Sequence, residues 1–123
     1  MALWDEVAAV RAGRGRSAAM IGEFRRTAVL VPLDDRGGLW TAGHEGVWWI
    51  HAFTDERALA RFAGARAGRR DWEYRTVLGA RLLDVVVPGL GEPAGVALDM
   101  GGERPMLFPP APGIVPDGVA VAP

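Results

Sequence analysis

His51 is the residue of this chain whose side chain is best suited to chemistry, and it lies in the stretch VWWIHAF at 47–53. An imidazole titrates near neutral pH, so it can move a proton or ligate a metal. Alternation along an extended strand places Trp49 on the same face as His51. Asp84 lies beside an apolar run and is the carboxylate that we assign to this pocket. Trp49, His51 and Asp84 therefore form one candidate site, for a small ligand or for an unrecognised reaction.

The remaining groups do not complete a catalytic motif. His44 and His51 are a potential metal pair, but no third ligand stands at a suitable spacing. Ser17 is the only serine, and no G-x-S-x-G elbow surrounds it. The absence of cysteine excludes thiol nucleophiles, cysteine-ligated zinc and iron–sulfur clusters, and the glycine-rich stretches match no nucleotide-binding pattern. We therefore expect no enzymatic activity, no metal and no cofactor.

A purely structural explanation of 47–53 competes with the pocket. The two faces of this segment are Val47, Trp49, His51 and Phe53 on one side and Trp48, Ile50 and Ala52 on the other. Both faces are apolar, which is typical of a strand that is covered on both sides. The segment TDERALARFAGARAG at 54–68 has helical spacing and would fold back onto this strand. In this interpretation the tryptophans and His51 belong to the core.

A second group of residues suggests a surface that binds another protein. Trp40, Trp72 and Tyr74 are large aromatic residues outside the most apolar segments. Ile114 and Val115 lie in PPAPGIVPDGVAVAP at 109–123, a proline-rich tail that is either disordered or an extended arm. Exposed aromatic residues often anchor protein interfaces. These five residues are our candidates for binding a partner.

Length and charge narrow the class of protein. A chain of 123 residues is the size of one domain. The start of the sequence lacks the basic and apolar regions of a secretory signal, and no apolar run is long enough to span a bilayer. All 14 basic residues are arginine, yet the net charge of −1 gives no field that would attract nucleic acid. We expect a cytoplasmic protein that binds neither membrane nor nucleic acid.

Hydropathy patterns predict alternating helices and strands. Helices are expected over 3–12, 18–26 and 54–68, with Thr54 as the N-cap of the last, and a further helix from 79 is ended by Pro88 and Gly89. Strands are expected over 27–33, 39–42, 47–53, 72–77, 94–100 and 104–108. The first three strands should form a meander and the last two a hairpin.

These elements predict an α+β fold. We expect a mixed, mainly antiparallel sheet of about five or six strands, with helices packed chiefly on one side. Residues 1–108 would form the single domain, and residues 109–123 the tail or arm.

Four blocks of the sequence, in order, carry a resemblance to a known family. They are VLVPLD at 29–34, AFTDERALARF at 52–62, GARLLDVVVP at 79–88 and the apolar strand at 95–99 before a glycine turn. In this order the chain resembles the SseB protein N-terminal domain family, in its single-domain actinobacterial form. Many members have Asn-Pro where this chain has LDMGGERP at 98–105. The resemblance implies an α+β domain without an established catalytic residue.

The sequence therefore favours a non-catalytic protein-interaction domain, with an adaptor or regulatory role and a protein partner whose identity the sequence does not give. A homodimer stays open. The alternative is a small-ligand sensor or unrecognised enzyme with a pocket near His51.

Overall fold

The computed structural model describes residues 18–67 and 72–121. Its helical elements are α2 (Ala18–Arg25), α3 (Glu56–Ala67), α4 (Gly79–Arg81), the π-helix η1 (Leu82–Val86), α5 (Val87–Gly89) and the 3₁₀-helix η2 (Asp117–Val119). Its strands are β1 (Ala28–Pro32), β2 (Thr41–His44), β3 (Val47–Ala52), β4 (Tyr74–Leu78), β5 (Ala94–Leu98) and β6 (Met106–Phe108). The helix expected over 3–12 lies outside the described residues.

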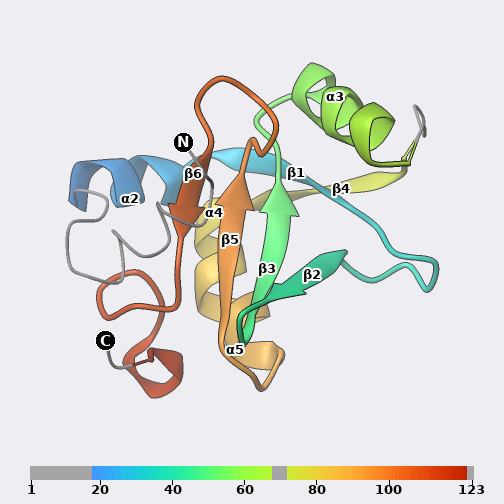
Figure 1. Ribbon diagram of the computed structural model, residues 1–123. Helices are drawn as coiled ribbons and strands as arrows, with labels where there is room; N and C mark the ends of the chain where they lie inside the picture. Colours follow the sequence, from blue (N-terminus) through green and yellow to red (C-terminus); the bar gives the residue numbers. More distant parts are fainter. Residues whose placement is uncertain (1–17, 68–71, 122–123) are drawn as a thin grey trace.

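The six described strands form two sheets, and the fold is α+β as predicted (Figure 1). One sheet has the order β2-β3-β5-β6, in which β3 and β5 are parallel and the other pairs are antiparallel. The hairpin of β5 and β6 confirms the expected final hairpin. The second sheet is a ribbon of β1 and β4, paired antiparallel from Ala28 opposite Leu78 to Pro32 opposite Tyr74.

The expected meander of the first three strands is confirmed for β2 and β3, which pair antiparallel, but is wrong for β1, which pairs with β4 rather than with β2. Pairing around the turn at 34–38 stops after the Leu33–Leu39 bridge and the hydrogen bond from the Trp40 N–H to the Pro32 carbonyl, at 2.9 Å. The chain then diverges to pair with β3. Leu30 instead exchanges two 2.8 Å backbone hydrogen bonds with Phe53, so that β1 crosses the end of β3 and joins the two sheets.

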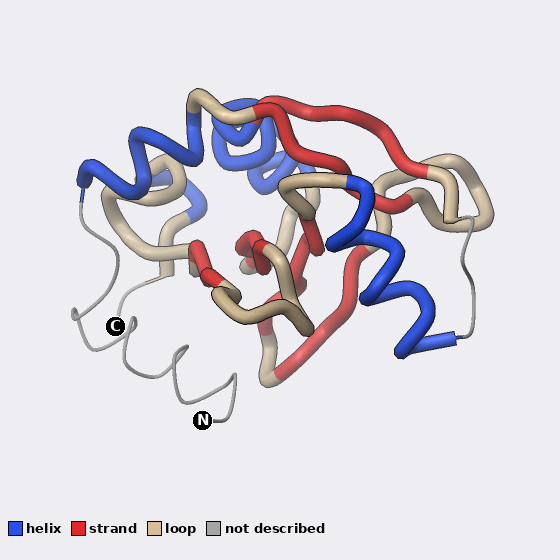
Figure 2. Tube along the Cα trace, turned by 90° about the horizontal axis from the view of Figure 1, so that it is seen from above, coloured by secondary structure: helices blue, strands red, loops and turns tan. Residues whose placement is uncertain are grey.

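The helices lie chiefly on one side of the four-stranded sheet. Helix α2 and the run α4–η1–α5 occupy one side, and α3 lies on the other (Figure 2). The helical run ends at Gly89, as Pro88 and Gly89 predicted. Proline has no N–H to donate, and the wider π-turn before it is closed by the hydrogen bond from the Val87 N–H to the Leu82 carbonyl.

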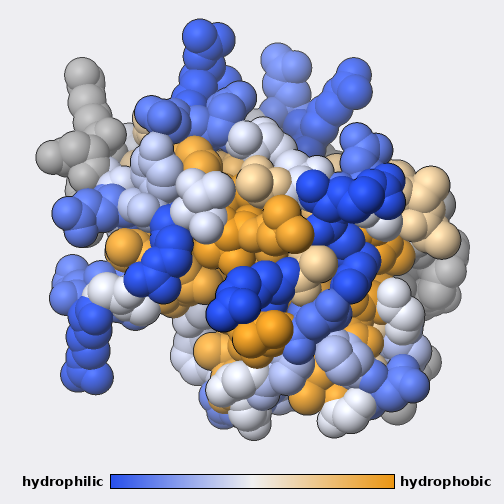
Figure 3. All heavy atoms as spheres, turned by 180° about the vertical axis from the view of Figure 1, so that it is seen from behind, coloured by the Kyte–Doolittle hydropathy of each residue, from blue (hydrophilic) through white to orange (hydrophobic). Residues whose placement is uncertain are grey.

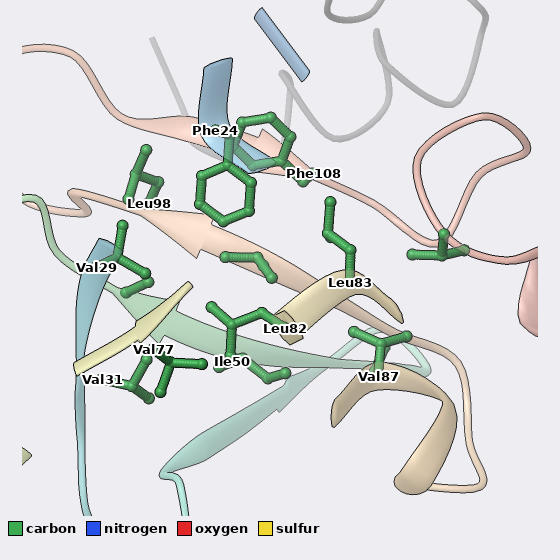
Figure 4. Close-up of a cluster of buried hydrophobic side chains, with 14 of the residues drawn as sticks. Phe24, Val29, Val31, Ile50, Val77, Leu82, Leu83, Val87, Leu98 and Phe108 are labelled. Carbon is green, nitrogen blue, oxygen red and sulfur yellow. The ribbon is translucent and has the colours of Figure 1, made fainter. Parts of the chain in front are cut away.

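The main core fills the space between the sheet and the helical run (Figure 4). Phe24 of α2 stacks on Phe108 of β6 with ring centroids 4.3 Å apart. Ile50 of β3 and Leu82 and Leu83 of the run are fully buried beside them. This burial of apolar surface is the main source of the fold's stability.

The opposite face of β3 supports a second, smaller cluster of Val47, Trp49, Ala97, Met100 and Leu107, against which Phe62 packs. Strand β3 is therefore covered on both faces, as its two apolar faces predicted. Trp48 departs from the expectation that the tryptophans are core, since 40% of its surface is exposed. Its indole N–H donates a 2.8 Å hydrogen bond to Glu92.

The segment after residue 108 turns back onto the body of the protein. Ile114 and Val115 are 7% and 4% exposed and belong to the main core. The Val121 N–H donates a 2.8 Å hydrogen bond to the Pro110 carbonyl, which closes this segment into a loop. Side chains beyond residue 108 therefore contribute to the same core, and the division at 108 stays a prediction.

Gly79 tests the close packing of α2 against the start of α4. A Cβ atom at this position would lie 2.0 Å from the Phe24 carbonyl oxygen. We predict that Gly79→Ala lowers the free energy of unfolding by about 2 kcal/mol or more. Gly89→Ala is the control, because a methyl group there would meet no atom within 4 Å, and helix propensity predicts an unchanged or slightly higher stability. Urea unfolding measures both, and equal stability of the two variants would contradict the packing.

Candidate functional site

Five aromatic rings meet between α3, β3 and the starts of β2 and β4, and we call them the aromatic cluster. Its members are Trp40, His51, Phe53, Phe62 and Trp72. The ring centroid of His51 lies 5.1 Å from those of both Trp40 and Phe62. Trp40 meets Trp72 edge to face at 5.1 Å, a favourable arrangement for aromatic rings. Segments that are far apart in the sequence thus share one packed group.

Helix α3 places Phe62 in this cluster through its apolar spacing. Leu59, Phe62 and Ala63 recur at helical intervals and face inward, and Leu59 and Ala63 are 4% and 0% exposed. The helix is capped by Asp55, whose carboxylate accepts a 2.8 Å hydrogen bond from the Ala58 N–H. The prediction that Thr54 is the N-cap is therefore wrong.

Thr54 is held instead by Asp99, which follows β5. The Asp99 carboxylate accepts hydrogen bonds of 2.9 Å from both the backbone N–H and the hydroxyl of Thr54. Asp99 adopts a φ of 54°, in the left-handed region that L residues rarely occupy. The pair ties the end of β5 to the loop that leads from β3 into α3, and so fixes where α3 begins.

Arg66 covers the outer side of the aromatic cluster. Its guanidinium carbon lies 4.9 Å from the centroid of Trp40 and 5.9 Å from that of Phe62, within the range of cation–π attraction. Arg66 is itself exposed, so that it covers the rings while its charge stays in contact with water. The Trp72 indole N–H donates a 2.7 Å hydrogen bond to the Leu33 carbonyl, which fixes the ring at the start of β4.

The imidazole of His51 is neutral inside this cluster. His51 is 8% exposed, and its Nδ1 atom has no hydrogen-bond partner among the described residues. Burial lowers the pKa of His51 to about 4, and the positive charge of Arg66 adds to this shift. A charged imidazole is therefore disfavoured at neutral pH.

An open groove of about 420 Å³ lies beside the cluster, between α3 and β4. Its lining residues are Glu56, Arg57, Leu59, Ala60, Ala63, Trp72 and Tyr74. The exposed Ala60 supplies apolar surface from α3 above the buried Leu59 and Ala63, and the two aromatic residues supply the opposite side. A hydrogen bond with Glu56 raises the pKa of Tyr74, with smaller contributions from burial and from the carboxylate charge. The groove thus combines apolar surface with polar groups.

The structure brings together three of the five residues that we expected to bind a partner. Trp72 and Tyr74 line the groove, and Trp40 contacts Trp72. Ile114 and Val115 do not join them, because both are buried in the main core. The α3 residues of the groove were not among the candidates, although the helical spacing of 54–68 predicted a helix that folds back onto the strand at 47–53. Sequence spacing cannot show that part of such a helix borders a groove.

The alternative pocket is not assembled. Trp49 and His51 share a face of β3, but Asp84 belongs to η1, which packs on the opposite side of the sheet through Leu82 and Leu83. Asp84 forms a two-pronged ion pair with Arg25, at 2.9 Å and 2.6 Å. This pairing lowers the pKa of Asp84 and raises that of Arg25. Its role is to join α2 to the helical run.

The described ranges contain neither a metal-binding cluster nor a membrane-spanning helix. No group of three or more His, Asp or Glu side chains within 18–67 and 72–121 is arranged to hold a metal ion. No helix in the same ranges has the length and apolarity to cross a bilayer.

The features described so far define a small α+β domain with a two-stranded ribbon, a four-stranded sheet and a surface groove between α3 and β4. Residues 5–112 match the family model of the SseB protein N-terminal domain. The match covers most of the chain, which therefore belongs to the SseB N-terminal domain family, as the four sequence blocks indicated. Neither curated proteins nor solved structures gave a match to the chain.

The burial of His51 predicts a pH-dependent stability. Its pKa rises from about 4 in the folded chain to about 6.5 in the unfolded chain, so that the unfolded state binds the proton more tightly. The contribution of the neutral His51 to the free energy of unfolding is fully present above pH 6.5. It falls by about 3 kcal/mol as the pH is lowered to 4. Urea unfolding of the wild type and of His51→Leu over this range measures it. We expect a shallower pH dependence in the variant, and parallel curves would contradict a neutral, buried imidazole.

Proposed function

We propose that this chain is a non-catalytic protein-interaction domain, with an adaptor or regulatory role in the cytoplasm, and that the α3–β4 groove is its binding surface. The observation that carries the proposal is the composition of the groove, in which the exposed Ala60 on α3 and the aromatic Trp72 and Tyr74 line an open surface above the buried Leu59 and Ala63. The groove is open to solvent, so that a partner side chain can enter it without rearrangement of the core.

The residue types of the groove suit a protein partner. Tryptophan and tyrosine offer large, rigid apolar surfaces with one polar group each, and they are enriched among the residues that dominate binding energy at interfaces. Glu56 and Arg57 place opposite charges on the α3 side of the groove, where they can orient a partner. The contact of Trp72 with Trp40 supports the aromatic side from behind, which limits the entropy lost on binding.

A small-ligand sensor with a pocket near His51 has less support. His51 is buried against Phe62 and Trp40 and does not line the groove. The carboxylate that we assigned to this pocket, Asp84, is engaged by Arg25 on the other side of the sheet. We therefore place the protein-interaction role first.

A pair of matched substitutions on α3 tests the groove. Ala60 is exposed and lines the groove, whereas Ala65 is exposed on the same helix outside it. We predict that Ala60→Arg fills the groove and reduces partner recovery at least about tenfold, while Ala65→Arg leaves recovery unchanged. The measurement is a quantitative pull-down with the full chain from a lysate of the cells that produce it.

The two variants have the same composition and are both expected to fold, because neither alanine belongs to the core. Recovery of the same proteins in the same amounts with wild type, Ala60→Arg and Ala65→Arg would contradict binding in the groove.

A further inference from the structure

Strand β4 has an open edge. It pairs with β1 on one side, and none of the other strands in the described part of the chain pairs with its second side. The Leu33 N–H donates to the Glu73 carbonyl and the Gly79 N–H to the Thr27 carbonyl, both at 2.8 Å, so that Glu73 and Gly79 face β1. Because backbone groups alternate in direction along an antiparallel strand, those of Tyr74 and Thr76 point outward.

The exposed Arg75 is the one charged side chain on β4. The strand sequence YRTVL contains neither proline nor glycine, and its pairing with β1 is unbroken over all five residues. Apolar side chains gather between charged ones on the side of the molecule that Figure 3 shows. The large apolar side chains that the described structure exposes are Met20, Trp48, Tyr74, Leu78, Val85, Leu90 and Val121. Tyr74 and Leu78, 38% and 48% exposed, are the two ends of β4.

We propose that β4 pairs antiparallel with β4 of a second copy of this chain, around a two-fold axis at Thr76. Thr76 is the middle residue of the strand and is exposed. The axis places Thr76 opposite Thr76 of the second copy, and each Tyr74 opposite a Leu78. Threonine pairs are among the favourable cross-strand contacts, and each Tyr74–Leu78 contact would remove apolar surface from water. The two β1–β4 ribbons then form one four-stranded sheet.

Charge selects this register over the neighbouring one. With the axis at Thr76, Arg75 lies opposite Val77 of the second copy. An axis at Arg75 would set two guanidinium groups directly opposite each other, and like charges in that position destabilise a strand pair. The axis at Thr76 therefore brings the apolar ends of the two strands together and sets no like charges opposite each other.

The second copy also adds a residue to the surroundings of the groove. Tyr74 lines the groove, and the axis at Thr76 brings Leu78 of the second copy beside it. The inference goes beyond the proposed function and does not depend on it, since the edge of β4 and the α3 side of the groove are altered by different substitutions.

Sedimentation equilibrium of the full chain, over a wide range of concentration, tests the pairing. We expect the wild type to associate to twice the chain mass. Thr76→Lys puts two like charges across the axis and should raise the dissociation constant at least about tenfold, as should Thr76→Glu. Thr41→Lys, the same substitution on the edge strand β2, should leave it unchanged.

The most specific test of the proposed axis is to mix two variants that carry opposite charges at position 76. An equimolar mixture of Thr76→Lys and Thr76→Glu sets opposite charges across the axis and should restore the dimer. Circular dichroism verifies that each variant is folded. A wild type that stays monomeric, a Thr76→Lys variant that associates as the wild type does, or a mixture that stays monomeric would each overturn the pairing. Ala60→Arg leaves the edge of β4 unchanged and tests partner recovery through the groove separately.

Discussion

The packing of Phe62 in α3 against His51 in β3 is the contact on which this surface depends. Their ring centroids are 5.1 Å apart, and the contact buries the imidazole in its neutral form. It also sets the position of α3, because Asp99 fixes the start of the helix through Thr54 while Phe62 fixes its middle. The groove exists because a helix held in this way stands beside β4 without covering it.

Local patterns predicted the elements well and their pairing less well. The apolar faces of 47–53 identified a strand covered on both sides, and Pro88 and Gly89 marked the end of the helical run. The partner of β1 could not be predicted in the same way. Its position depends on the Leu30–Phe53 bridge and on pairing with β4, which joins residues far apart in the sequence. Spacing and propensity describe neighbours along the chain and contain no information about such contacts.

In the candidate site too, local features were predicted from the sequence and long-range packing was not. Trp72 and Tyr74 were recognisable because large aromatic residues at the start of a half-exposed strand suggest a surface. Ile114 and Val115 looked similar in sequence, yet the chain folds back and uses them in the core. Asp84 was assigned to His51 on residue type alone, whereas the packing of η1 through Leu82 and Leu83 places it on the opposite side of the sheet. Which side of a sheet an element covers is decided by tertiary packing.

The ionisation of His51 tests most directly whether α3 closes over β3. Nuclear magnetic resonance of the full chain, with labelled imidazole rings, follows the His51 signal as the pH is lowered. The account predicts that His51 stays neutral at pH 5 and begins to titrate only near its pKa of about 4, because the cluster excludes water from the ring. A titration midpoint near 6.5, the value of an exposed imidazole, would contradict the packing of Phe62 on His51 and with it the groove that depends on α3.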